Sequence, residues 1–121
     1  MRTHPLDFIQ INASVAERDS EARILPLAAE RGMAVLINRP FAGGDLFSRV
    51  RRLPLPPWAG EIGAQSWAQV LLKYVLSNPA VTCAIPGTRN PRYILDNLDA
   101  ATGPLPDAAQ RRRIVEAVAG A

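Results

Sequence analysis

Three short apolar runs, each followed by a stretch suited to a helix, constrain what this chain can fold into. They are "LDFIQIN" at residues 6–12, "MAVLIN" at residues 33–38 and "VTCAI" at residues 81–85. The second and third runs are apolar almost throughout, as expected of strands in a parallel sheet that is buried on both faces. Strands that alternate with helices form right-handed βαβ units. We therefore predict an α/β fold of three parallel βα units with one further helix at the C-terminal end.

The stretch after the first strand, "DSEARILPLAAERG" (19–32), is predicted to be a helix. Asp19 or Ser20 would cap its start, and Gly32 would end it in the left-handed conformation that glycine adopts easily. Pro26 lies inside this helix, where a proline removes a hydrogen bond. We therefore expect this helix to be kinked or to begin late.

The clearest helix is "SWAQVLLKYVLSNP" (66–79). Ser66 is suited to cap it, and Gln69, three residues later, fits a capping box. The apolar stripe expected along one side of this helix consists of Ala68, Leu71, Leu72 and Val75. The segment before it, residues 39–65, is interpreted as a long loop with one helical turn near 45–50. Two further helices are predicted, from Pro91 to about residue 101 and after Pro106.

Composition matters mainly for the partners that it excludes. The 121 residues are 48% hydrophobic and 21% charged, with a formal net charge of +3, and residues 1–121 are interpreted as one domain. This mild charge suits a small anion better than a nucleic acid, and the arginine clusters at 49–52 and 111–113 are interpreted as solvated surfaces. No apolar run reaches the roughly 18 residues that a membrane span needs. We expect neither a nucleic acid nor a membrane as partner.

The single cysteine, Cys83, excludes an internal disulfide and is compatible with a reducing, cytoplasmic location. Because it lies within a strand predicted to be buried, we interpret it as a packing residue rather than a reactive thiol. We predict no metal site.

The junction "CAIPGTRNPRYILDN" (83–97) carries the strongest functional signal. Gly87 lets the backbone approach a ligand closely, Thr88 offers a hydroxyl, and Arg89 offers a fork suited to phosphate. Asn90 and Pro91 open a helix whose free N–H groups face the same place. These features predict a site for a phosphorylated ligand at the carboxyl end of a strand. An ordinary strand-to-helix turn is the alternative interpretation.

Two segments of the chain resemble the aldo-keto reductases. "VLSNPAVTCAIPGTRNPRYILDNLDAA" is similar to the last strand and helix of that family, and "LDFIQINASVAERDSEARILPLAAERGMAVLINRPFAGG" to the segments before them. The resemblance implies a TIM-type (β/α)8 barrel, of which this chain would hold strands six, seven and eight. It also implies NADPH-dependent reduction of aldehydes or ketones by the full enzyme. Such a barrel takes roughly 250 residues, so the resemblance implies a truncated, C-terminal portion.

The resemblance also assigns roles to residues of the first two strands. Gln10 falls where the family's glutamine holds the nicotinamide carboxamide. Asn38 falls where many members have a tyrosine that stacks on the nicotinamide ring, and it offers hydrogen bonds instead. Arg39, Phe41 and Gly43 lie in the turn that follows the pyrophosphate.

At the junction, the resemblance implies contacts to the other end of NADP(H). Thr88 matches the hydroxyl that binds the 2′-phosphate, and Asn97 matches the contact to adenine. Gly87 replaces a lysine of some members, a loss for which Arg89 could compensate. Tyr93 stands where other branches have an arginine.

The family's catalytic Asp, Tyr, Lys and His come from strands that would precede Met1. The chain's only lysine, Lys73, lies within a helix expected outside the sheet, and its only histidine, His4, precedes the first strand. A proton relay needs both groups at the hydride-transfer centre, so we predict no catalytic residue here and no turnover by this chain alone.

A three-stranded piece of a barrel has open sheet edges, which predict self-association or pairing with a complementary chain. The alternative function is therefore a non-catalytic module that binds a nucleotide or completes another chain's barrel. A different phosphate-binding barrel is a third possibility.

Overall fold

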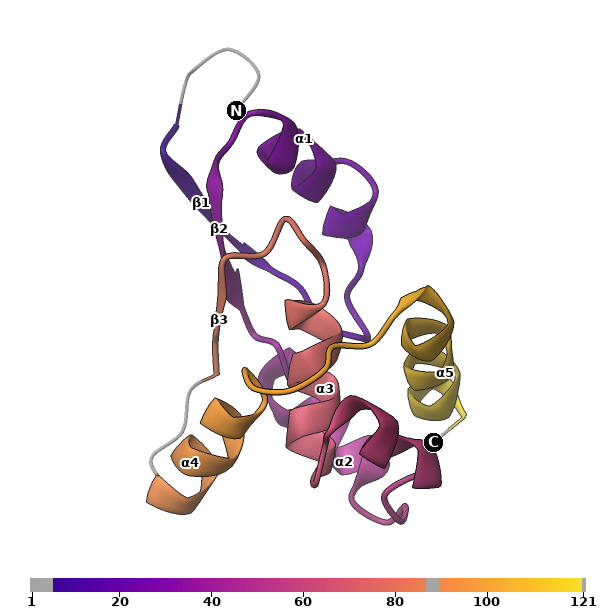
Figure 1. Cartoon of the computed structure of the whole chain (residues 1–121). Coiled ribbons are helices and arrows are strands. Elements are labelled where there is room, and N and C mark those ends of the chain that lie inside the picture. The colour runs from indigo at the N-terminus through magenta and orange to yellow at the C-terminus, as the bar shows by residue number, and fades with distance from the viewer. Residues whose placement is uncertain (1–5, 87–89, 121) are drawn as a thin grey trace.

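The three predicted strands form one parallel sheet. In a computed structural model of the protein, which describes residues 6–86 and 90–120, they lie in the order β1-β2-β3. Their bounds are Phe8–Asn12 for β1, Ala34–Asn38 for β2 and Cys83–Ile85 for β3. Gln10 lies opposite Leu36, and Asn38 lies between Asn12 and Ile85. Parallel pairing brings the carboxyl ends of all three strands to one end of the sheet (Figure 1).

Helices cover only one face of this sheet (Figure 1). Helix α1 (Ile24–Glu30) packs against β2, and helix α3 (Trp67–Leu76) packs against β3. Val35 and Ile37 belong to the apolar core and are completely buried. The alternating side chains of the strands point to the opposite face, which no described element covers.

The prediction that the strands are buried on both faces is wrong, most clearly for β3. Cys83 and Ile85 are exposed, and Ala84 between them is half-buried. Cys83 is therefore not the packing residue that the sequence predicted. The physical reason is that a sheet of three strands does not curl far enough to place its own side chains opposite this face.

Helix α1 begins late, at Ile24, rather than being kinked at Pro26. Pro26 is the third residue of the helix, where the backbone N–H has no partner within the helix anyway. Neither predicted cap starts α1, because Asp19 and Ser20 belong to a separate 3-10 helix, η1 (Asp19–Glu21). Gly32 follows α1 with a φ of 66°, as predicted for the left-handed stop.

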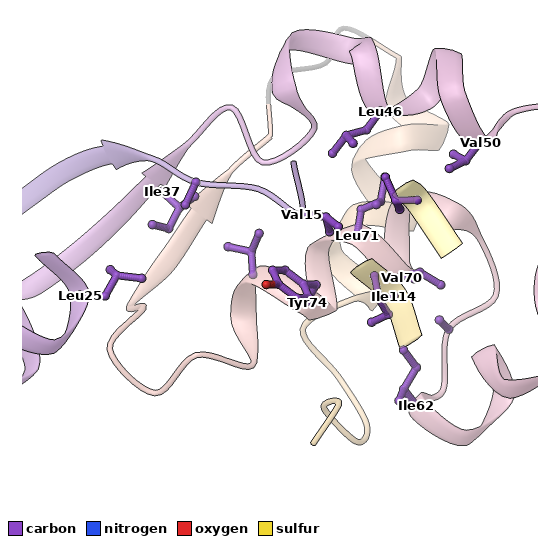
Figure 2. Close-up of a cluster of buried hydrophobic side chains, with 14 of the residues drawn as sticks. Val15, Leu25, Ile37, Leu46, Val50, Ile62, Val70, Leu71, Tyr74 and Ile114 are labelled. Carbon is purple, nitrogen blue, oxygen red and sulfur yellow. The ribbon is translucent and has the colours of Figure 1, made fainter. Parts of the chain in front are cut away.

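Helix α3 is the centre of the molecule. The Ser66 hydroxyl caps it by accepting a hydrogen bond from the Gln69 backbone N–H at 3.2 Å. The Gln69 side chain accepts from the N–H of Gln65, one residue before the position that a capping box requires. Every residue from Gln69 to Val75 is buried, so the predicted apolar stripe is too narrow. Figure 2 shows Val70, Leu71 and Tyr74 of α3 within the apolar cluster.

The segment between β2 and α3 contains more helix than the one predicted turn, because two 3-10 helices flank it. Its elements are η2 (Ala42–Gly44), α2 (Asp45–Val50) and η3 (Pro57–Ile62). Leu46, Val50 and Ile62 enter the core completely and explain why these short helices form. No helix in the described part of the chain is long and apolar enough to span a membrane.

Two helices follow β3, α4 (Pro91–Asp99) and α5 (Ala108–Ala119). Ile114 and Val118 of α5 are buried in the core. Arg111 was predicted to lie on a solvated surface with its two neighbours, which is wrong. Its guanidinium lies 4.1 Å from the centre of the Tyr74 ring and pairs with Glu21 at 2.7 Å. An arginine that stacks on an aromatic face and pairs with a carboxylate is stable in a half-buried position.

Candidate functional site

Two amide side chains meet on the uncovered face, toward the carboxyl end of the sheet. Gln10 of β1 donates a hydrogen bond from Nε2 to Oδ1 of Asn38 in β2, at 2.6 Å. The two residues share a face because the strands alternate and are in parallel register. The bond leaves one carbonyl oxygen, on Gln10, and the amide N–H groups of Asn38 for other partners.

A third amide side chain, which the sequence analysis missed, lies on this face. Asn12 is directly opposite Asn38 in the register and is exposed. The signal was available, because alternation along the strand puts Asn12 on the same side as Gln10.

The turn after β2 has an unusual backbone. Arg39 and Ala42 have φ angles of 50° and 53°, and Gly43 and Gly44 follow with 67° and 96°. Left-handed conformations cost about 1–3 kcal/mol at residues other than glycine and cluster at ligand sites. Two such residues within one short turn therefore point to this turn as a functional element.

Inside the turn, the Arg39 side chain lies over Gly43. A Cβ atom built on Gly43 would come within 2.8 Å of Arg39 Nη2, so a side chain at residue 43 would displace the guanidinium. The Phe41 ring faces the core and packs on Phe47, with ring centres 4.6 Å apart. Of the predicted residues in this turn, Arg39 and Gly43 are exposed, whereas Phe41 is half-buried.

At the start of α4, the Asn90 side chain accepts a hydrogen bond from the Arg92 N–H at 3.0 Å, as predicted for a helix cap. Tyr93 is exposed, and Asn97 is half-buried beside a groove next to β3. Gly87, Thr88 and Arg89 lie outside the described residues.

Helix α4 is held in place through its polar side. The Asp96 carboxylate accepts hydrogen bonds from Ser66 Oγ at 2.7 Å and from Gln69 Nε2 at 2.9 Å. Lys73, completely buried, donates from Nζ to the carbonyls of Thr102 at 2.6 Å and Pro104 at 3.0 Å, behind the end of α4. These contacts fix α4 to α3.

The structure thus brings part of the predicted site together. Gln10 and Asn38 are bonded to each other, and Arg39 and Gly43 follow directly after Asn38. Between residues 6–86 and 90–120, no hydrogen bond or ion pair joins this group to Tyr93 or Asn97.

The buried titratable groups lie away from the amide pair. Burial in the helical core lowers the pKa of Lys73 and raises the pKa of Tyr74, whose hydroxyl bonds to Glu21 at 3.0 Å. Among the described residues, no three His, Cys, Asp or Glu side chains form a cluster that could hold a metal ion.

Comparison with protein families finds that residues 1–118 match the model of the Aldo/keto reductase family. A search of curated proteins finds no match.

Three solved structures share the fold of this chain. The holo form of aldo-keto reductase AKR11C1 from Bacillus halodurans is 21% identical with a TM-score of 0.69, and its apo form is 20% identical with 0.70. The thermostable aldo-keto reductase Tm1743, in complex with the inhibitor epalrestat, is 18% identical with 0.63. These alignments cover 96–97% of this chain but only 41–44% of the other chains. The open three-stranded sheet therefore matches part of a TIM-type barrel, and the chain spans less than half the length of these structures.

Proposed function

The chain belongs to the aldo/keto reductase family, and from this premise we propose that it carries the cofactor-binding side of an NADP(H)-dependent carbonyl reductase. The cofactor would supply the hydride for reduction of an aldehyde or ketone. The residues of this chain would bind and orient the cofactor, and the remaining strands of the barrel would supply the groups that transfer the proton. A cytoplasmic location, compatible with the one free cysteine, is part of the same proposal.

The observation that carries this proposal is the bonded amide pair of Gln10 and Asn38 beside the strained turn. A primary carboxamide such as that of nicotinamide has one acceptor and two donor hydrogens. The pair offers the complementary groups, a carbonyl oxygen from Gln10 and N–H groups from Asn38. The next residues, Arg39 to Gly43, then lie where a pyrophosphate attached to the same ligand would extend, with a guanidinium to meet it.

The adenosine end of the cofactor would be bound at the start of α4. Thr88 and Arg89 are proposed to bind the 2′-phosphate, Gly87 to allow its close approach, and Tyr93 and Asn97 to contact the adenosine. The Asp96 contacts to Ser66 and Gln69 support this role, since they hold α4 beside the sheet.

We also propose that this chain alone does not turn over a carbonyl substrate. Tyr74 and Lys73 are the neighbouring tyrosine and lysine of α3, but both are buried in the helical core. The Tyr74 hydroxyl is bonded to Glu21 and the Lys73 ammonium to two backbone carbonyls, which keeps both from a ligand on the sheet's other face. A proton donor must come within hydrogen-bond reach of the reacting oxygen.

Titration of the chain with NADPH, followed by calorimetry or tryptophan fluorescence, tests the proposal. We expect saturable binding that is weaker for NADH, which lacks the 2′-phosphate. Gln10→Ala should weaken the binding of both cofactors about tenfold, the effect of losing one or two hydrogen bonds. Thr88→Ala combined with Arg89→Ala should weaken NADPH alone, to the level of NADH.

The control variant is Ser48→Ala, an exposed residue of α2 that lies outside the proposed site. A folded chain that binds neither cofactor would overturn the proposal. Equal loss of NADPH and NADH in the Thr88 and Arg89 variant would refute the 2′-phosphate assignment while leaving the nicotinamide end intact.

The second candidate function is a barrel-completing module, which the two free edges of the sheet favour. The order β1-β2-β3 leaves the outer side of β1 and of β3 without a strand among the described residues. Co-expression with a polypeptide that supplies the remaining βα units should then yield a stable complex that oxidises NADPH. Failure to form any complex would exclude this role.

A further inference from the structure

Helix α4 is oriented with its polar side toward the molecule and its apolar side outward. None of its residues is buried, and the exposed fractions reach 66% for Leu95 and 62% for Leu98. The contact with α3 is made by Asp96, a charged residue. Figure 1 shows α4 at the margin of the molecule, beyond β3. The outward side, which we call the α4 face, consists of Ile94, Leu95 and Leu98.

An apolar groove lies next to the α4 face. It has a volume of about 390 Å³ and runs between α4, β3 and the end of α3. Ile94 and Leu98 form one wall, and Leu72 and Leu76 of α3 form part of the other. A leucine side chain from another molecule would find apolar contacts on both sides of this groove.

The charges that flank the α4 face are at the wrong ends of the helix. Arg92 lies in the first turn and Asp99 in the last, whereas the helix dipole favours an acidic start and a basic end. Neither side chain forms an ion pair within the described part of the chain. They are seven residues apart, almost two full turns, and therefore lie on the same side of the helix. Nothing inside the monomer compensates this unfavourable pattern.

We propose that the α4 face binds the α4 face of a second copy of this chain, with the two helices antiparallel about a two-fold axis. In this arrangement Arg92 of each copy lies beside Asp99 of the other, so two ion pairs form and each misplaced charge gains a partner. Leu95 and Leu98 lose their exposure against the partner's helix and groove. Because a two-fold contact joins the same patch on both molecules, a patch with one charge of each sign at its two ends is self-complementary.

Sedimentation equilibrium of the full chain over a range of concentrations at low salt tests this contact. We expect a monomer–dimer equilibrium that weakens as salt screens the ion pairs. Arg92→Asp should weaken association about tenfold or more, because it turns two attractions into two repulsions. Asp99→Arg should do the same, and the double variant Arg92→Asp, Asp99→Arg should restore association. Both reversals agree with the helix dipole, so circular dichroism should show that helix content is kept.

Leu95→Asp places a charge in the middle of the α4 face and should abolish the dimer, while Leu53→Asp, on a half-exposed leucine of the loop after α2, is the matched control. A chain that stays monomeric at every concentration overturns the proposal. So does a double reversal that fails to recover association, or a dimer that survives Leu95→Asp. If a chain carrying the remaining barrel strands covers the α4 face with higher affinity and only that complex forms, the second copy is not the occupant.

Discussion

Helices α3 and α4 are neighbours of similar length, yet one is buried almost all round and the other is exposed all round. In α3 every residue from Gln69 to Val75 is buried, including a lysine and a glutamine. In α4 no residue is buried, although four of its nine residues are large and apolar. The first helix is surrounded by α2, η3, α5, β3 and α4, whereas the second touches mainly α3.

The difference separates what this chain can stabilise by itself from what needs another polypeptide. The elements around α3 all belong to the chain and close a core. The side of α4 that is rich in apolar residues points to the edge where the sheet ends after β3. Apolar burial near β3 and α4 therefore depends on a partner, and mutations in the two regions should have different consequences.

Truncating a leucine in each helix should give the largest contrast. Leu71→Ala opens a cavity in the completely buried core and should lower the free energy of unfolding by about 2–5 kcal/mol. Leu95→Ala removes an exposed side chain and should change it by less than about 0.5 kcal/mol. Urea denaturation at a concentration where the chain is monomeric measures both. Equal losses would mean that α4 is part of the core and would end the comparison.

Removing the link between the two helices should have an intermediate effect. Asp96→Ala deprives the buried Gln69 and the half-buried Ser66 of their acceptor and should cost about 1–3 kcal/mol. Hydrogen exchange should increase in α4 while α3 stays protected. Asp99→Ala, which removes a carboxylate from the same helix without breaking that link, is the control. Loss of protection in α3 would show that α4 supports the core.

The two tyrosines provide the smallest and most selective contrast. Tyr74→Phe in α3 loses the hydrogen bond to Glu21 and should lower the free energy of unfolding at pH 7 by about 1 kcal/mol. Tyr93→Phe in α4 should change it by less than about 0.5 kcal/mol.

The tyrosine variants also differ in their dependence on pH. Burial raises the pKa of Tyr74 above its ordinary value of 10.0. Above pH 10.0 the unfolded chain loses this proton before the folded chain does, so the folded state binds more protons and stability falls as the pH rises. The stability advantage of the wild type over Tyr74→Phe should therefore be constant below pH 10.0 and shrink above it. Lys73 is present in both proteins and cancels. An advantage that grows above pH 10.0 would contradict the assignment.

The order of strands and helices was predictable because it depends on local patterns. Apolar runs of strand length, the Ser66 cap and Gly32 fix where elements begin and end without reference to the rest of the fold. Burial was not predictable in the same way. Cys83 lies in an apolar run, but whether such a run is covered depends on elements beyond the edge of the sheet. Arg111 belongs to a run of arginines, yet the packing of α5 turns it toward Tyr74 while its neighbours stay outside.

The candidate site was predictable in its residues and only partly in its geometry. The contact between Gln10 and Asn38 follows from two parallel strands with amides on one face. The positive φ angles of Arg39 and Ala42 have no signal in the sequence, because neither residue type favours that conformation. The roles of residues 87–89 stay predictions.

The position of α5 has a consequence for how the chain is made in the cell. Ile114 and Val118 fill the same core as Val15 and Leu25, and Arg111 pairs with Glu21, 90 residues earlier in the chain. The core therefore cannot close until residue 118 has left the ribosome. Until then the apolar side chains of the first strands and of α3 stay open to solvent and to other nascent chains. Folding must be almost entirely post-translational, and a chaperone that binds apolar segments should associate with this protein throughout its synthesis.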